Sequence, residues 1–243
     1  MKRYYFLGAC LTLACSLVSN YGAETNQPPS PPALTTNTAA IPAPHERNND
    51  WQRKMTRFGG KHFDIIFEGD SIMNRWETTG KEIWNQRYAG IAADFGIEGD
   101  HVENVLWRLE NGQADGIDPK VIVLMIGTNN TSHNTAGQIA EGIKYVIDEY
   151  RKRCPRARII LMGVFPRGEK PTDGARRKMA EVNAQIKMYD DGQRVSYVDI
   201  GPQMIEADGT ISREMMPDFL HPTAKGYRIW ADAIQPLINK FTK

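Results

Sequence analysis

Short apolar runs alternate along this chain with longer segments that have helical periodicity. The run at 120–127, KVIVLMIG, is almost continuously apolar, which is typical of a strand buried on both faces. Runs of the same kind lie at 63–69, 91–97, 158–165 and 195–200. Because apolar strands separated by helices are typical of parallel sheets covered on both faces, the pattern predicts an α/β fold with a central parallel sheet.

The segments between these runs carry apolar residues at helical spacing. Within 101–112, Val102, Val105 and Leu109 share one face, and Gly112 provides a natural end. Three further helices are predicted at 136–155, 174–189 and 221–241. Ligands of parallel sheets bind at the carboxyl ends of the strands, so residues that directly follow the strands are the first candidates for a functional site.

The first 23 residues have the pattern of a secretory signal peptide. Lys2 and Arg3 precede an apolar stretch that is too short for a comfortable membrane span, and small residues follow. Cleavage near Ala23 is one expectation. The alternative is a lipoprotein-type signal, in which Cys10 or Cys15 carries a lipid anchor. In either case the pattern predicts an exported protein that is periplasmic, extracellular or anchored to the membrane.

Residues 24–47 are rich in proline, threonine and alanine, which predicts a disordered linker and places the folded domain at 48–243. The chain has 243 residues, 41% of them hydrophobic, and a formal net charge of +1, as expected for an ordinary globular domain. No basic run is interleaved with aromatic residues, which argues against nucleic-acid binding. Cys154 is the one cysteine beyond the signal, so an intramolecular disulfide is not expected.

Ser71 stands where the run at 63–69 ends in Gly-Asp-Ser. A serine before a helix is usually a cap, and it becomes a nucleophile only with a neighbouring base and a group that orients this base. Among the five histidines, His221 alone follows a suitable acid, Asp218, by three residues; His45 falls in the predicted linker. Over a turn, this spacing can bring the carboxylate onto the imidazole and fix its tautomer.

Two further residues are candidate donors to an oxyanion. Gly99, in GIEGD, follows the run at 91–97, and its backbone N–H can approach a ligand closely. Asn129, in GTNN, follows the strand at 120–127 and offers a side-chain amide. Taken singly, the glycine suits a turn and the asparagine suits a cap. Together with Ser71 they follow three successive strands, so we expect all three at one edge of the sheet.

The motifs GDS, GIEGD, GTNN and DFLH resemble the four sequence blocks of the SGNH (GDSL-type) hydrolases. The longer stretches FGIEGDHVENVLWRLENG, VIVLMIGTNN, VFPRGEKP and DFLHPTAKGY more closely resemble the platelet-activating-factor acetylhydrolase alpha-subunit-like esterases. The resemblance spans residues 51–240. It implies a flavodoxin-like three-layer α/β/α sandwich that needs no metal or cofactor.

The resemblance also implies a role for each motif residue. Ser71 corresponds to the nucleophile, His221 to the general base and Asp218 to the acid that orients it. The backbone N–H groups of Ser71 and Gly99 and the side chain of Asn129 correspond to the oxyanion hole.

Two other residues are expected at the substrate. Glu98 departs from the closer relatives, which often carry glycine there, and a carboxylate beside the oxyanion hole is expected to shape the substrate site. Arg167, in PRGEKP, follows a strand end and is expected at the rim of the site, although a solvated loop arginine fits the pattern equally well.

We therefore expect an exported serine carboxylic-ester hydrolase that cleaves short acyl esters through an acyl-enzyme. O-acetyl groups on sugars or glycans are the preferred substrate class. A lipid, lysophospholipid or platelet-activating-factor acetylhydrolase-like esterase is one alternative, and a catalytically silent glycan-binding SGNH module is another. Besides the small-molecule or glycan ester, the expected partners are a lipid anchor at the N-terminus and a second copy in a homodimer.

Overall fold

A five-stranded parallel sheet forms the centre of the computed structural model, which describes residues 36–243. The strand order is β2-β1-β3-β4-β5, and all neighbours are parallel. The strands are β1 Ile65–Gly69, β2 Ala92–Asp94, β3 Val121–Met125, β4 Arg158–Met162 and β5 Val195–Val198. Each lies within a run that the sequence predicts as a strand, so the predicted α/β fold with a central parallel sheet is confirmed.

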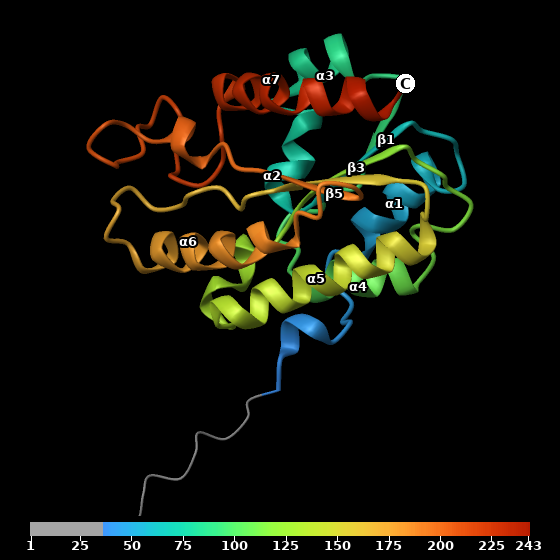
Figure 1. The fold of residues 1–243 in the computed structure, drawn as a ribbon, viewed down its shortest axis with the longest axis horizontal. Helices are drawn as coiled ribbons and strands as arrows, with labels where there is room; N and C mark the ends of the chain where they lie inside the picture. Colours follow the sequence, from blue (N-terminus) through green and yellow to red (C-terminus); the bar gives the residue numbers. More distant parts are fainter. Residues whose placement is uncertain (1–35) are drawn as a thin grey trace, which may run out of the picture. The chain divides into compact units, whose positions relative to one another are not determined.

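Helices cover both faces of the sheet, so the described chain is a three-layer sandwich (Figure 1). One face carries α4, α5 and α6 together with α1, and the other carries α2, α3 and α7. Successive strand residues supply the two cores: Ile122 faces the first set of helices and Val123 the second. The helices are α1 Asn48–Phe58, α2 Ser71–Asn74, α3 Lys81–Arg87, α4 Val102–Glu110, α5 Ala136–Arg153, α6 Gly174–Ile186 and α7 Ala224–Phe241.

Short 3-10 helices lie in several of the connections. They are η1 Thr38–Ala40, η2 Arg75–Glu77, η3 Thr128–Ser132, η4 Lys187–Tyr189 and η5 Gly201–Met204. The helix η3 directly follows the end of β3 and carries Asn129, whereas α2 follows β1 and begins with Ser71. Parallel register therefore brings both residues to the carboxyl edge of the sheet, as predicted.

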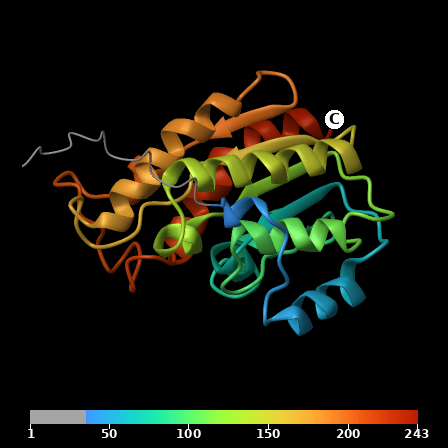
Figure 2. The same cartoon turned by 90° about the horizontal axis from the view of Figure 1, so that it is seen from below.

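Residues 36–47 belong to the folded unit, so the predicted domain boundary at residue 48 is wrong (Figure 2). Ala39 is fully buried, and its carbonyl oxygen packs so closely on Gly142 of α5 that a β-carbon there would lie 2.5 Å away. The side chain of Asn104 donates to the carbonyl of Ala43 at 2.9 Å. The segment 36–47 is held by one small apolar residue and a few hydrogen bonds. Contacts of this kind give no periodic pattern in the sequence, so the boundary could not be predicted from it. The predicted signal peptide, the cysteines at 10 and 15, and the rest of the predicted linker lie outside the described residues.

The two longest described helices, α5 and α7, have 18 residues each and bury one face in the sandwich. Cys154, directly after α5, is buried with a free thiol. Across residues 36–243, no helix combines the length and the apolar character that crossing a bilayer requires.

Candidate active site

Ser71 is presented by a tight turn between β1 and α2. The strand ends at Gly69, where a β-carbon would overlap the carbonyl oxygen of Met125 on the neighbouring strand. Asp70 then caps α2, because its Oδ1 accepts a hydrogen bond from the backbone N–H of Ile72 at 2.9 Å. The cap of this helix is thus Asp70, which leaves the hydroxyl of Ser71 free for another partner.

That partner is His221, and a carboxylate lies behind it. The Ser71 Oγ lies 2.9 Å from Nε2 of His221, and Nδ1 of His221 lies 2.6 Å from Oδ2 of Asp218. The side chain of His221 is 13% exposed and that of Asp218 is 51% exposed. The structure therefore brings together the three residues that the sequence predicts as nucleophile, base and orienting acid.

The backbone between Asp218 and His221 makes this contact possible. Phe219 has a φ of 57°, the one positive φ of a non-glycine residue in the described chain, and the chain folds back there. As a result, Oδ1 of Asp218 accepts the backbone N–H groups of Leu220 at 3.1 Å and His221 at 2.8 Å. Partial burial alone would raise the pKa of Asp218, but the hydrogen bonds from His221 and Leu220 lower it to about 2. The carboxylate stays ionised and can stabilise an imidazolium.

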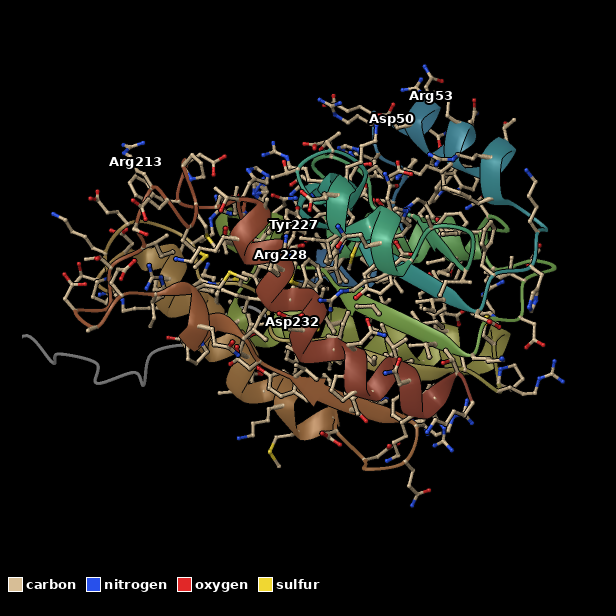
Figure 3. All side chains as sticks on the ribbon, turned by 90° about the horizontal axis from the view of Figure 1, so that it is seen from above. Asp50, Arg53, Arg213, Tyr227, Arg228 and Asp232 are labelled. Atoms are coloured by element: carbon tan, nitrogen blue, oxygen red, sulfur yellow. The ribbon has the colours of Figure 1, made fainter. Side chains whose placement is uncertain are left out.

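A tertiary hydrogen bond ties the histidine segment to the serine turn. Tyr227, in the first turn of α7 (Figure 3), donates its hydroxyl to the backbone carbonyl of Ile72 at 2.7 Å. Both residues are buried. Because Ile72 directly follows Ser71, this bond fixes the start of α7 against the turn that carries Ser71.

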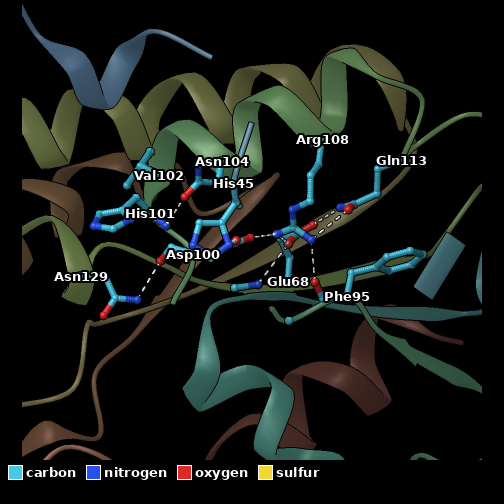
Figure 4. Close-up of polar contacts among 12 residues, drawn as sticks. His45, Glu68, Phe95, Asp100, His101, Val102, Asn104, Arg108, Gln113 and Asn129 are labelled. Atoms are coloured by element: carbon cyan, nitrogen blue, oxygen red, sulfur yellow. Dashed lines mark hydrogen bonds and ion pairs between the residues drawn. The ribbon is translucent and has the colours of Figure 1, made fainter. Parts of the chain in front are cut away.

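Gly99 and Asn129 lie in the two loops that follow β2 and β3. Gly99 has a φ of 82°, a conformation that favours glycine. The Nδ2 of Asn129 donates to the backbone carbonyl of Asp100 at 2.8 Å (Figure 4). The amide group has a second N–H, which can donate to an oxyanion. The two loops are therefore joined at Asp100, next to the predicted backbone donor.

A buried charged network, which the sequence does not predict, lies behind these loops. Arg108 on α4 contacts two carboxylates, since its Nη2 lies 2.7 Å from Oε1 of Glu68 and 2.8 Å from Oδ2 of Asp100 (Figure 4). Gln113 and Tyr150 donate to the other oxygen of Glu68. Burial raises the pKa of Asp100 to about 7, against the opposing charge of Arg108. A glutamate inside the apolar run IIFEG is the sequence signal that could have pointed to this network.

The two predicted substrate-binding residues have protein partners in the structure. Glu98 lies beside Gly99, and its Oε1 is 3.4 Å from Nε of Arg75. Both side chains are about one third exposed. Arg167 donates through Nη1 to the carbonyl of Thr128 at 2.8 Å, so it supports the loop that carries Asn129. Whether either residue binds substrate stays a prediction.

Comparison with known proteins identifies the family of this chain. The model of the GDSL-like lipase/acylhydrolase family matches residues 67–229. Subunit alpha2 of platelet-activating factor acetylhydrolase IB from Rattus norvegicus is 40% identical over 200 residues, which cover 79% of this chain and 86% of the relative.

Two solved structures have a similar fold. A GDSL-like lipase from Bacteroides thetaiotaomicron matches with a TM-score of 0.65 and 21% identity, over 79% of this chain and 98% of that one. An acetylxylan esterase from Geobacillus stearothermophilus matches with a TM-score of 0.58 and 19% identity, over 74% of this chain and 94% of that one. The SGNH hydrolase fold expected from the sequence is thereby confirmed.

Proposed function

Because the chain belongs to the GDSL-like lipase/acylhydrolase family and is a carboxylic-ester hydrolase, we propose that it removes short acyl groups, above all acetyl, from sugars or glycans outside the cytoplasm. The observation that carries the proposed reaction is the continuous chain from Ser71 Oγ to His221 Nε2 at 2.9 Å and from His221 Nδ1 to Asp218 at 2.6 Å. A nucleophile, a base and an orienting acid at these distances suit acyl transfer to serine.

The proposed reaction has two steps. In the first, Ser71 Oγ attacks the ester carbonyl carbon while Nε2 of His221 accepts the hydroxyl proton. The negative charge that develops on the carbonyl oxygen is stabilised by the N–H groups of Ser71, Gly99 and Asn129. The imidazolium then donates its proton to the leaving alcohol, and the acyl group remains on Ser71. In the second step, a water molecule attacks the acyl carbon while His221 accepts a proton from it. The bond between the acyl carbon and Ser71 Oγ then breaks, His221 returns the proton to Ser71 Oγ, and the carboxylic acid leaves.

The acetyl preference is supported by two names among the similar proteins, an acetylhydrolase subunit and an acetylxylan esterase. The preference for a sugar as the alcohol is supported by charged side chains at the oxyanion loop, the loop 95–101 between β2 and α4 that carries Gly99. Glu98 directly precedes Gly99, and Arg75 lies 3.4 Å from Glu98. Both side chains are charged and about one third exposed, so they can form hydrogen bonds to a hydroxyl-rich leaving group.

A second candidate function is the hydrolysis of a lipid ester. It is favoured by the 40% identity to a platelet-activating factor acetylhydrolase subunit, which is well above the identity to the acetylxylan esterase. A silent glycan-binding module is a weaker candidate, because Ser71, His221 and Asp218 are present and in hydrogen-bonding geometry.

Export and anchoring are proposed from the sequence alone. Lys2 and Arg3 before an apolar stretch support a signal peptide, and Cys10 or Cys15 supplies the thiol of a lipoprotein-type alternative. Fractionation of bacterial cells that express the full chain, together with the Cys10→Ala and Cys15→Ala variants, tests both. A protein that stays in the cytoplasm at its full mass would contradict export.

The substrate class is tested by measuring acetate release from acetylated xylo-oligosaccharides and from a short acetylated ether phospholipid. We expect release from the oligosaccharide with a kcat/KM at least about tenfold above that for the lipid, a difference of about 1.4 kcal/mol in transition-state binding. The reverse order would establish the lipid candidate. The Ser71→Ala variant is the matched control, because it lacks only one oxygen atom.

A further inference from the structure

The segment before α1 reaches the oxyanion loop through one side chain, that of His45. A β-carbon placed on Gly99 would lie 3.4 Å from Cε1 and 3.6 Å from Nε2 of His45, so the imidazole packs directly on this glycine. On its other side, Nδ1 of His45 lies 3.4 Å from Oδ1 of Asp100 (Figure 4). The side chain of His45 is only 19% exposed. The sequence predicts a disordered linker at this histidine, whereas the structure places its side chain on Gly99 and Asp100.

Asp100 connects the two proposed oxyanion donors that lie outside the turn that carries Ser71. Its peptide bond joins it to Gly99, and its carbonyl accepts the side-chain amide of Asn129 at 2.8 Å. Its carboxylate is 1% exposed and is held from the interior by Arg108 at 2.8 Å. A shift of the Asp100 backbone would therefore disturb the side chain of Asn129 directly, and the backbone of Gly99 through the adjoining peptide bond.

His45 and Arg108 contact different oxygen atoms of the Asp100 carboxylate. Oδ2 of Asp100 contacts Arg108, whereas Oδ1 faces His45. Burial lowers the pKa of His45, so a neutral imidazole covers the loop and adds no charge to the network. The segment itself is anchored elsewhere, through Ala39 in the core and through Asn37, which donates to the carbonyl of Gln138 at 3.1 Å. Its position does not depend on His45 alone.

We propose that His45 is a positioning residue of the esterase, which holds Gly99 and Asp100 in the geometry that directs the N–H groups of Gly99 and Asn129 at the oxyanion. This inference rests on the proposed function, because it takes these groups as the oxyanion hole. If His45 has this role, the segment 36–47 completes the active site, although this segment lies outside the sequence blocks of the family.

The test compares wild type with three single variants of the segment 36–47, and with Asn129→Ala alone and combined with His45→Ala, all in the full chain and on p-nitrophenyl acetate. His45→Ala removes the contact to Asp100, His45→Gln keeps a side-chain amide that can donate to the carboxylate, and Asn37→Ala weakens the same segment far from the site. The kcat is expressed per active site, counted by titration with a fluorophosphonate, and Tm is measured for each variant. A misplaced oxyanion donor costs about tenfold to a hundredfold in rate.

We expect His45→Ala to lower kcat about tenfold to a hundredfold with KM changed less than about twofold, and His45→Gln to recover most of the loss. Asn37→Ala is expected to lower Tm and leave kcat unchanged. If His45 acts through the oxyanion hole, adding His45→Ala to Asn129→Ala costs much less than it costs in wild type.

An unchanged kcat per active site in His45→Ala would overturn the inference, and so would an equal loss in Asn37→Ala. Independent, additive losses in the double variant would also contradict it. A wild-type protein without esterase activity that depends on Ser71 would instead overturn the proposed function. The two failures are therefore distinguishable in one set of measurements.

Discussion

The hydroxyl of Ser71 lies 2.9 Å from Nε2 of His221, a residue 150 positions further along the chain. Ser71 begins α2 after the first strand, and His221 precedes the last helix. The fold brings these two residues together. The hydrogen bond from Tyr227 to the carbonyl of Ile72 joins the start of α7 to the turn that carries Ser71. The chemistry of the site therefore depends on a long-range contact. The residues that form and surround this contact can be substituted one at a time.

Asp218→Asn is expected to lower kcat by about 10²- to 10⁴-fold and to leave the protein folded. The carboxylate accepts the N–H of His221, whereas an amide can present its NH₂ group and select the wrong imidazole tautomer. Steady-state kinetics with p-nitrophenyl acetate give the change in kcat, and circular dichroism checks the fold. Asp208→Asn, in an exposed turn, is the control and should keep full activity. A kcat within about threefold of wild type would rule out Asp218 as the orienting acid.

Asn129→Ala is expected to lower kcat by about 10²- to 10³-fold, the usual effect of removing one oxyanion donor. The KM should change little, because the donor acts mainly on charge that develops in the transition state. Asn85→Ala, on the exposed face of α3, is a matched control that should behave as wild type. If Asn129→Ala raised KM and kept kcat, Asn129 would be a residue that binds the ground state of the substrate.

Arg108→Met is expected to lower the free energy of unfolding by roughly 3–5 kcal/mol. Removing the guanidinium leaves the carboxylates of Glu68 and Asp100 buried without a cation. Arg228→Met is the control (Figure 3): its guanidinium is 3.7 Å from Glu82 at the surface, and such exposed pairs contribute about 0–1 kcal/mol. Urea denaturation measures both, and similar losses in the two variants would contradict a structural role for the buried network.

Asp70 is expected to make the wild type less stable as the pH rises from about 4 to about 7. Burial raises the pKa of this carboxyl from 3.8 to about 7, more than the hydrogen bond from Ile72 lowers it. The folded state therefore keeps a proton that the unfolded chain has lost. This stabilisation is complete below about pH 4 and is lost as the pH rises through 7.

The variant Asp70→Asn keeps the acceptor for Ile72 but cannot ionise. Its free energy of unfolding should depend less on pH in this window, by up to about 1.4 kcal/mol per pH unit. Urea titrations of both proteins at pH 4.5, 5.5 and 6.5 measure the difference. Identical slopes in the two proteins would show that Asp70 does not hold a proton in the folded state.

The strands and the contact of Ser71, His221 and Asp218 could be predicted from the sequence because each has a strong local pattern. The run KVIVLMIG is apolar throughout, and β3 lies within it. The three-residue spacing of Asp218 and His221 suits a turn, and the structure forms one there, with Phe219 at a positive φ.

The segment 36–47, the buried pair of Arg108 and Glu68, and helix α1 could not be predicted, because they depend on contacts that no local sequence pattern reveals. The segment 36–47 folds onto α5 through Ala39 and a few hydrogen bonds, so its proline-rich composition suggested a linker. Arg108 and Glu68 are 40 residues apart, and their pairing appears only once α4 packs on the sheet. Helix α1 was missed for a similar reason: it buries little besides Lys54 and Phe58 and carries mostly polar residues.

We infer that Ser71 is the nucleophile of an esterase for short acyl groups. The decisive measurement is the hydrolysis of p-nitrophenyl esters with two, four, eight and twelve carbons by wild type and by Ser71→Ala at equal concentration. We predict a kcat/KM that falls steeply beyond the short chains and a loss of several orders of magnitude in Ser71→Ala, with Tm nearly unchanged. A Ser71→Ala variant that stays within about tenfold of wild type, or a rate that rises with chain length, would contradict the account.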